Sequence, residues 1–538
     1  MTTYDHGMVC AAQPEAVEAG AEILAAGGNA VDAAVATALV QTVVDPSMCG
    51  IAGFGSLQVL DPATGKNACL DFHGRAPLAT TPTMWEHLLE GESDDGFGFF
   101  LKGRVNELGY GAITTPMTLR GLSEALRLHG SGAYKLPDLL GPAIKYARDG
   151  FPVRPHMSAF WSSVPTEGRA PMSEFLTWSS APRKIYAPKG RVLATGETLR
   201  NPDMATTLAT VQVRGVEDFY LGSIAARIVA DMKANGGLIS ADDLALSKPE
   251  ETTPLKGTYR DVTITTTPPP GGGVMLIEML NILEHFDLKA MGHNSARYIA
   301  TVSEAMKIAT VDKDLKVGDP RFIDVPLAEL TSKDYAAKHA ARIKAGEKTH
   351  VPRLKSKESK DTTHVCAVDR NGVCATMTHT LGTPSGVITD GLGFMYNGAM
   401  AVFDPRPGKP GSLAPGKSRF SSMAPSILYR GGKPFLVVGA PGGTYIAMGI
   451  LQAILNAVDF GMNALEAVSA PRFCTTSDTV QLTNRILRKT EADLGAMGYP
   501  VRRWPMNYHF AGVHAIRIDG RVLDGGADPG RDGMALRV

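Results

Sequence analysis

The chain has 538 residues, of which 44% are hydrophobic and 20% charged, an ordinary composition for a globular protein. Lys and Arg together number 54, as do Asp and Glu, so the formal net charge is zero and offers no bulk attraction to nucleic acid or to an anionic membrane. The six cysteines form no CxxC pair and no zinc-ligand spacing with histidine, and we interpret them as buried free thiols.

Two helices are predicted over residues 14–44. The stretch "PEAVEAGAEILAA" has helical apolar spacing and is stopped by Gly27 and Gly28, and "NAVDAAVATALVQTVV" begins with Asn29, a favourable N-cap residue. The second stretch is too short to span a bilayer and contains Asp32, so we expect no membrane partner. The N-terminus lacks the basic run and apolar core of a secretory signal, which predicts a cytoplasmic protein.

Helices dominate the first two-thirds of the chain. A glycine loop leads into a strand from about Leu57 to Leu60, and residues 118–240 have mostly helical patterns. The segment "TYRDVTITTTPPPGGG" is a strand that ends in a triple proline and a glycine turn, followed by an apolar helix and by more helix over 294–345. Residues 347–360 are polar and basic and contain a proline, so we expect an exposed, mobile segment.

Strands dominate the last third. "THVCAV" and "VCATMTHT" flank the turn "DRNG" and predict a hairpin, and "SILYR", "PFLVVGAP" and "VHAIRIDGRVLDGGAD" predict further strands. Helices in the first part and strands in the second favour an α+β layered fold in which helices cover sheets.

Two threonines, Thr362 and Thr363, lie where the polar segment becomes a strand. A threonine pair at a strand start is usually structural. It also has a chemical interpretation: if the bond between Asp361 and Thr362 is cut, Thr362 gains an α-amine with a pKa of about 7.7–8.0. Such an amine accepts the proton of the Thr362 hydroxyl near neutral pH, so one residue supplies nucleophile and base.

The stretch "DTTHVCAVDRNGVCATMTHTLG" resembles the start of the small subunit of gamma-glutamyltransferases, which are N-terminal-nucleophile hydrolases. Four other segments resemble that family in the same order along the chain: Glu22–Pro46, Pro268–Glu284, Arg419–Ile427 and Gly439–Ile446. The resemblance covers essentially the whole chain, which is identified as a member of the family on these motifs together.

The resemblance implies an α+β fold of the four-layer αββα sandwich type. It also implies a precursor that cleaves itself between Asp361 and Thr362. The products would be a large subunit, residues 1–361, and a small subunit, residues 362–538, which together form one αββα unit. A dimer of such heterodimers is compatible with this organisation.

The resemblance implies a catalytic role for four residues. Thr362 would be the nucleophile and, through its amine, the base, and Thr380 would hydrogen-bond the nucleophile. The backbone N–H groups of Gly442 and Gly443 would form the oxyanion hole, where a donor is typically worth about 2.7–4 kcal/mol. Taken alone, paired glycines usually serve turns, and Thr380 is compatible with a purely cross-strand contact.

Two serines, Ser421 and Ser422, match serines that hold the substrate carboxylate or shape the pocket; taken alone, they are ordinary loop residues. The family's carboxylate-binding arginine aligns with His73. Arg75 lies two residues later, on the same face of a strand, and is a candidate replacement. A structural ion pair is the alternative for Arg75, and a structural role is the alternative for His73.

The chain departs from the family where the substrate's α-ammonium is bound. The family has an "NNQMDDF"-like stretch there, and this chain has "YNGAMAVF". Asn397 remains, as a candidate substrate contact, but Ala399 replaces the glutamine, and Ala401 and Val402 replace two aspartates. Gly382, a further candidate substrate contact, replaces an asparagine. A buried ammonium without partners typically costs several kcal/mol, so we expect poor use of gamma-glutamyl donors.

The leading hypothesis is therefore an amidohydrolase that cleaves a small-molecule amide whose acyl group lacks the α-amine, through an acyl-enzyme on Thr362. Oxamate amidohydrolases and some cephalosporin acylases resemble this family and accept such substrates. A true gamma-glutamyltransferase or glutathione hydrolase is one alternative, and an uncleaved, non-catalytic binding relative is another. This chemistry requires no metal and no organic cofactor, and we expect no nucleic-acid partner.

Overall fold

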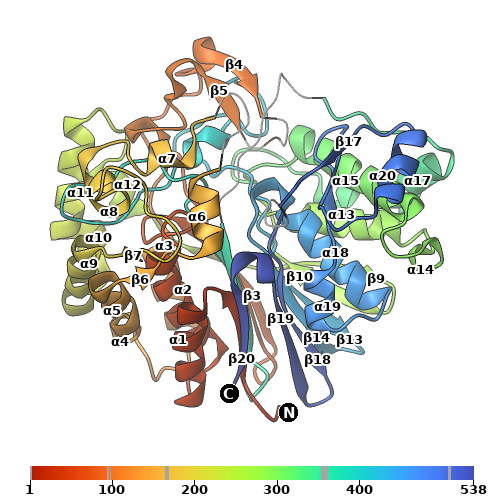
Figure 1. Ribbon diagram of the computed structural model, residues 1–538, viewed down its shortest axis with the longest axis horizontal. Coiled ribbons are helices and arrows are strands. Elements are labelled where there is room, and N and C mark those ends of the chain that lie inside the picture. Colours follow the sequence, from red (N-terminus) through yellow and green to blue (C-terminus); the bar gives the residue numbers. More distant parts are fainter. Residues whose placement is uncertain (1–2, 94–95, 97, 164–168, 353–361, 507–509) are drawn as a thin grey trace.

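The computed structural model describes residues 3–93, 96, 98–163, 169–352, 362–506 and 510–538 (Figure 1). Two large sheets face each other in the centre, and helices cover the outer face of each sheet (Figure 1). This is the predicted four-layer αββα sandwich, which is confirmed. The predicted cleavage position lies beside residues 353–361, which are outside the described residues.

The first sheet is antiparallel throughout, with the order β20-β1-β11-β12-β2-β3-β8. Its strands are β1 (Met8–Ala12), β2 (Phe54–Asp61), β3 (Lys66–Phe72), β8 (Glu250–Thr252), β11 (Thr363–Val368), β12 (Cys374–Thr380) and β20 (Gly533–Arg537). The predicted hairpin after Thr362 is thus β11–β12, and it forms the buried middle of this sheet. The chain's first and last strands, β1 and β20, complete one side of it.

The second sheet is also antiparallel, with the order β19-β18-β14-β13-β10-β9. Its strands are β9 (Leu255–Tyr259), β10 (Val262–Thr266), β13 (Ser426–Arg430), β14 (Lys433–Gly439), β18 (His514–Asp519) and β19 (Val522–Ala527). The further strands predicted near the C-terminus are present and pair as the hairpins β13–β14 and β18–β19. Only β9 and β10 come from the part of the chain before Thr362.

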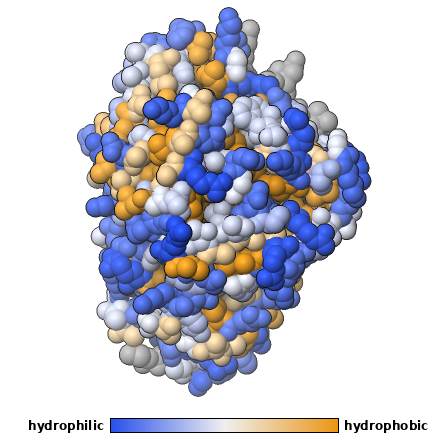
Figure 2. All heavy atoms as spheres, turned by 90° about the vertical axis from the view of Figure 1, so that its left-hand side faces the viewer, coloured by the Kyte–Doolittle hydropathy of each residue, from blue (hydrophilic) through white to orange (hydrophobic). Residues whose placement is uncertain are grey.

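Helices α1 (Pro14–Ala25), α2 (Ala30–Val44) and α3 (Thr118–His129) pack on the first sheet. Further helices of this layer are α5 (Gly141–Asp149), α9 (Pro202–Arg214), α10 (Glu217–Leu221) and α11 (Ser223–Ala234). The outer face on this side of the molecule mixes hydrophilic and hydrophobic residues (Figure 2).

The predicted N-cap of α2 is confirmed. The Asn29 side chain accepts hydrogen bonds from the N–H groups of Val31 and Asp32, and the Asp32 carboxylate accepts one from Asn29 N–H. Such a reciprocal pair satisfies backbone donors that the first turn leaves free. It fixes the start of α2, all of whose residues are buried against β11, β12 and neighbouring helices.

The opposite layer lies on the second sheet. Helices α13 (Gly273–Leu283), α18 (Ile446–Val458) and α19 (Ala464–Ser469) contact its strands. Further helices on this side are α15 (Ala296–Lys316), α17 (Lys333–Lys344) and α20 (Arg488–Ala496). No helix in the described ranges is both long enough and apolar enough to cross a bilayer.

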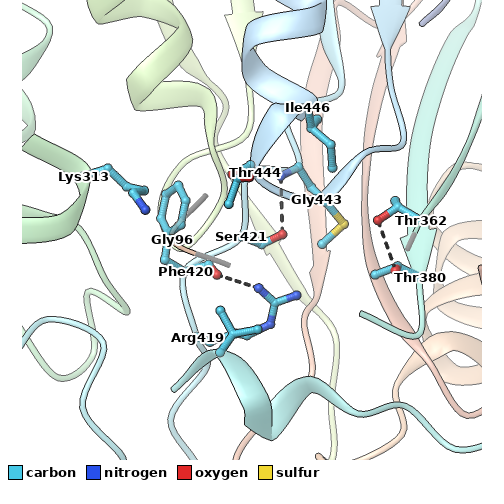
Figure 3. A pocket seen from close by; sticks show the side chains of 13 residues that line it. Gly96, Lys313, Thr362, Thr380, Arg419, Phe420, Ser421, Gly443, Thr444 and Ile446 are labelled. Carbon is cyan, nitrogen blue, oxygen red and sulfur yellow. Dashed lines mark hydrogen bonds between the residues drawn. The ribbon is translucent and has the colours of Figure 1, made fainter. Parts of the chain in front are cut away.

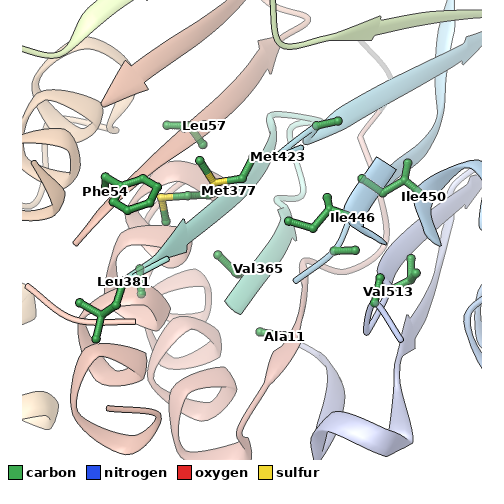
Figure 4. Close-up of a cluster of buried hydrophobic side chains, with 14 of the residues drawn as sticks. Ala11, Phe54, Leu57, Val365, Met377, Leu381, Met423, Ile446, Ile450 and Val513 are labelled. Atoms are coloured by element: carbon green, nitrogen blue, oxygen red, sulfur yellow. The ribbon is translucent and has the colours of Figure 1, made fainter. Parts of the chain in front are cut away.

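The core runs through all four layers. Buried side chains from both sheets and from α18 meet in it, among them Phe54, Val365, Met377 and Ile446 (Figure 4). Fully burying such a side chain contributes about 1.5–3 kcal/mol. All six cysteines are buried and free, as predicted.

Candidate active site

Four neighbouring strands of the first sheet bring residues that are distant in the sequence to the same end of the sheet. Thr362 directly precedes β11, Thr380 ends β12, Phe54 begins β2, and His73 follows β3. The register pairs Thr380 with Phe54 across β12 and β2, and the next pairing places Gly55 opposite the last residue of β3. The antiparallel order β11-β12-β2-β3 therefore places Thr362, Thr380 and Phe54 at the same end of the sheet, with His73 one strand further along.

The two threonine hydroxyls are hydrogen-bonded to each other. Thr380 Oγ1 donates to Thr362 Oγ1 at 3.2 Å (Figure 3). The N–H of Gly382 donates to Thr380 Oγ1 at 2.8 Å, so the Thr380 oxygen is used as an acceptor while its proton points at Thr362. Gly382 has a φ of 75°, which favours glycine. Thr362 is 4% exposed and Thr380 2%, so the pair is largely shielded from water.

Helix α2 holds the strand pair beside these hydroxyls. Gln41 donates through Nε2 to Thr363 Oγ1 at 3.1 Å, and its Oε1 lies 2.9 Å from His379 Nε2. Thr363 and His379 are register partners. Burial lowers the pKa of His379 to about 3, so the ring is neutral and donates from Nε2 to the Gln41 oxygen. This contact fixes the backbone one residue away from Thr362 and Thr380.

The paired glycines, Gly442 and Gly443, lie between β14 and the start of α18. They have φ values of 139° and 55°. A Cβ on Gly442 would lie 2.6 Å from the Cα of Ala511, so only glycine fits there. Gly443 lines the same pocket as Thr362. The N-terminal end of α18 carries partial positive charge, which favours a developing oxyanion at this place.

The loop that carries Ser421 and Ser422 is held in place by the "PPPGGG" turn, which precedes α13. Ser421 N–H donates to Pro270 O, and Gly272 N–H donates to Met423 O, both at 2.8 Å. A Cβ on Gly272 would lie 2.8 Å from the Cα of Ser422. Gly272 of "PPPGGG" therefore permits a close approach to the loop that carries Ser421 and Ser422, and both serines line the pocket.

The pocket has an empty volume of about 350 Å³ (Figure 3). Besides the residues already placed in it, it is lined by Gly96, Lys313, Val402, Arg419, Phe420, Met423, Thr444 and Ile446. Of the lining residues in the described part of the chain, Lys313 and Arg419 are cationic and none is acidic. A wider groove of about 1170 Å³ shares Lys313, Val402 and Phe420 with it, so the pocket opens outward at that end.

The two candidate carboxylate-binding residues of the N-terminal part lie outside this lining. Arg75 Nη2 donates to Glu250 Oε1 at 2.5 Å and to the Lys248 carbonyl at 3.2 Å, so it forms the structural ion pair. His73 Nδ1 lies 2.6 Å from Asp71 Oδ1. The structure does not bring either side chain into the pocket with Thr362.

Asn397 also lies outside the lining. Its Oδ1 accepts from the N–H and the hydroxyl of Thr114 at 3.0 and 2.8 Å. Its Nδ2 donates to the carbonyls of Ala52 and Thr114 at 2.9 and 2.8 Å. The amide is thus occupied in joining three loops. Of the positions where ammonium acceptors are missing, Val402 does line the pocket.

Arg419 is a pocket residue to which the sequence analysis assigned no role. It is 6% exposed, its Nη1 donates to the Phe420 carbonyl at 2.9 Å, and its guanidinium lies 5.1 Å from the centre of the Phe54 ring. Burial lowers the pKa of Arg419 to about 10, so it stays charged at neutral pH. The available signal was its position, two residues before Ser421 and two after Lys417 in the sequence "KSRFSSM".

Within the described residues, no group of three or more His, Cys, Asp or Glu side chains is arranged to hold a metal ion. The site combines two hydrogen-bonded threonine hydroxyls, a glycine loop and a pocket lined by two cationic side chains. Such a set is suited to acyl transfer.

Comparison with known proteins agrees with this set. The family model described as gamma-glutamyltranspeptidase matches residues 16–538. The chain is 36% identical over 542 residues to the acylase ACY 1 proenzyme of Pseudomonas sp. (strain V22), covering 100% of this chain and 94% of that protein. It is 36% identical over 487 residues to the glutathione hydrolase proenzyme of Pseudomonas sp. (strain A14), covering 87% of this chain and 81% of that protein.

A solved structure is similar over the whole length. The cephalosporin acylase from Bacillus halodurans superimposes with a TM-score of 0.87 at 28% identity, covering 100% of this chain and 96% of that one. The similarity therefore extends to the arrangement of both sheets and not only to the short motifs.

Proposed function

The chain belongs to the gamma-glutamyltranspeptidase family, and from that premise we propose that it is a self-processing amidohydrolase whose acyl substrate lacks an α-amine. Processing would cut between Asp361 and Thr362 and leave a large subunit, residues 1–361, and a small subunit, residues 362–538. The proposal includes an acyl-enzyme on the Thr362 hydroxyl.

In the first half of the reaction, Thr362 Oγ1 attacks the amide carbonyl while its proton passes to the Thr362 α-amine. The carbonyl oxygen becomes an oxyanion, stabilised by backbone N–H groups of the Gly442–Gly443 loop and by the end of α18. Collapse of this intermediate breaks the C–N bond, and the amine leaves with the proton from the Thr362 ammonium. An ester between the acyl group and Thr362 remains.

In the second half, water attacks the ester and gives a proton to the Thr362 amine. Collapse releases the acyl group as a carboxylic acid and returns the proton to the Thr362 oxygen. Thr380 supports both halves, because its hydroxyl donates to that oxygen whenever charge builds up on it.

The observation that carries the proposal is the hydrogen-bonded pair Thr362–Thr380 at a pocket with two cations and, among its described lining residues, no acid. An acyl group with an α-ammonium would need acceptors there. The position at Val402 offers only an aliphatic side chain.

A matched pair of substrates tests the proposal. Glutaryl-p-nitroanilide differs from gamma-glutamyl-p-nitroanilide only in lacking the α-amine. We expect the larger kcat/KM for the glutaryl compound, followed by release of p-nitroaniline. Faster turnover of the gamma-glutamyl compound would refute the substrate proposal and favour the second candidate, a gamma-glutamyltransferase or glutathione hydrolase. The relatives named glutathione hydrolase favour that candidate.

A denaturing gel tests the remaining alternative, an uncleaved binding relative. We expect two bands, of about two-thirds and one-third of the chain, from the position of Thr362. A single full-length band together with no turnover of either anilide would favour the binding relative.

A further inference from the structure

We infer that Arg419 binds a carboxylate at the far end of the acyl group, so that the substrate is a monoamide of a small dicarboxylic acid. This inference rests on the proposed amidohydrolase function and adds a specificity-determining residue to it. We thus assign carboxylate binding to Arg419, which lies after Thr362 in the chain. The sequence resemblance had assigned carboxylate binding to His73 or Arg75.

The Arg419 guanidinium lies over the ring of Phe54. The Phe54 ring supports the guanidinium at 5.1 Å, and its backbone pairs with Thr380 across β2 and β12. The same ring lies 6.4 Å from the His73 ring and would lie 3.3 Å from a Cβ on Gly382. Phe54 therefore connects the Arg419 guanidinium to the strand end that carries Thr380 and lies beside Gly382.

The loop that carries Arg419 is fixed on both sides. Ser418 N–H donates to Asp319 Oδ2 at 2.8 Å, and Ala76 N–H donates to the Lys417 carbonyl at 2.8 Å. On the other side, Ser421 N–H is bound to Pro270. A guanidinium on such a loop loses little conformational freedom when it binds a ligand.

Geometry and charge then select the ligand. Arg419 and Thr362 line one pocket, and Figure 3 shows the guanidinium of Arg419 pointing toward Ser421 and the side of the pocket that holds Thr362 and Thr380. A planar guanidinium binds a carboxylate with two parallel hydrogen bonds. The hydroxyls of Ser421 and Ser422 line the same pocket and are further donors.

The outer end of the pocket suits the leaving group. Lys313 and Phe420 lie where the pocket joins the wider groove, with the Lys313 ammonium 5.5 Å from the Phe420 ring centre and paired with Asp314. The acyl carboxylate and the leaving amine thus have separate places. An α-ammonium on the acyl group would lie in the cationic part of the pocket and be repelled.

The test compares a charged and a neutral acyl group of equal length. We expect the wild-type enzyme to prefer glutaryl-p-nitroanilide to valeryl-p-nitroanilide in kcat/KM. Arg419→Gln should lose about 10- to 100-fold on the glutaryl compound and less than about threefold on the valeryl compound. Arg127→Gln, at an exposed arginine of α3 that pairs with Glu124, is the matched control and should leave both values unchanged.

Three outcomes would overturn the inference. Equal losses of Arg419→Gln on both compounds would mean a purely structural role. A wild-type enzyme that uses the valeryl compound as well as the glutaryl one would refute the carboxylate site while leaving the amidohydrolase proposal intact. Turnover of gamma-glutamyl-p-nitroanilide alone would refute the proposed function and this inference with it.

A second measurement does not depend on the variant's folding. Glutarate should inhibit the wild-type enzyme at a concentration at least about tenfold lower than valerate, because only glutarate carries a second carboxylate for Arg419. Equal inhibition would contradict the inference.

Phe54→Leu, which removes the ring but keeps the arginine, should weaken the glutaryl preference by a smaller factor than Arg419→Gln.

Discussion

The two ends of the pocket differ in how far they follow the family. At the end proposed to hold the nucleophile, Thr380 donates to Thr362 as the resemblance implies, and Gly443 lines the same pocket. At the acyl end, Val402 and Gly382 replace polar residues, and Arg419 supplies a cation from another loop. In the proposed reaction, the bond-breaking step depends on backbone geometry, whereas the choice of acyl group depends on a few side chains on loops, which can change without altering that geometry.

The largest effect is expected at the nucleophile. Thr362→Ala removes the attacking hydroxyl, so it should prevent self-cleavage and lower turnover of glutaryl-p-nitroanilide by at least about a thousandfold. Thr362→Ser keeps a hydroxyl and should keep both cleavage and measurable turnover. A Thr362→Ala protein that still runs as two bands and hydrolyses the anilide would exclude Thr362 as the nucleophile.

A change at the acyl end should alter substrate choice. Val402→Asp places a carboxylate on the pocket wall, where it attracts an α-ammonium and repels an acyl carboxylate. The ratio of kcat/KM for gamma-glutamyl over glutaryl anilide should rise by about 10- to 100-fold. Val402→Asn, which has the same shape without the charge, is the control, and an equal rise with it would rule out an electrostatic cause.

A smaller effect is expected at Thr380. Thr380→Val keeps the shape and removes the hydrogen bond to Thr362 Oγ1, so kcat should fall about tenfold, and KM should change little. Thr380→Ser should retain most of kcat. If the valine variant raised KM and left kcat unchanged, Thr380 would be a substrate contact and not an orienting group.

Local patterns in the sequence predicted the parts of the fold that depend on neighbours in the chain. The helix pair with its Asn29 cap and the hairpin β11–β12 are of this kind. Strands β1 and β20 are only five residues each and carry no distinctive alternation, and they form because their partners are distant segments of the chain.

The acyl end was harder to predict for the same reason. Arg75 has a suitable position in the sequence, but its partner Glu250 is 175 residues away. Asn397 fits the motif, yet Thr114, 283 residues away, takes up its amide. Arg419 contacts the ring of Phe54, which is 365 residues earlier in the chain and which no local pattern links to it.

A further prediction concerns the stability of the fold against acid and not catalysis. Burial holds the pKa of His379 at about 3, below its ordinary 6.5, so the folded state favours the neutral ring. The stability that this ring contributes is present above pH 6.5 and is lost as the pH falls toward 3, by up to about 1.4 kcal/mol per pH unit.

The variant His379→Gln keeps an amide donor for Gln41 and does not titrate. Between pH 7 and pH 5 its free energy of unfolding should fall by about 2 kcal/mol less than that of the wild type. Chemical denaturation at both pH values measures the difference. Equal losses for the two proteins would mean that His379 does not contribute to acid sensitivity.

The most direct test of the central claim is intact-mass spectrometry of the wild-type protein, quenched in acid during turnover of glutaryl-p-nitroanilide. The account predicts two chains, one of which begins at Thr362 and carries a glutaryl group on that residue. An undivided chain that nevertheless turns over the anilide, or an acyl group found on a different residue, would contradict it.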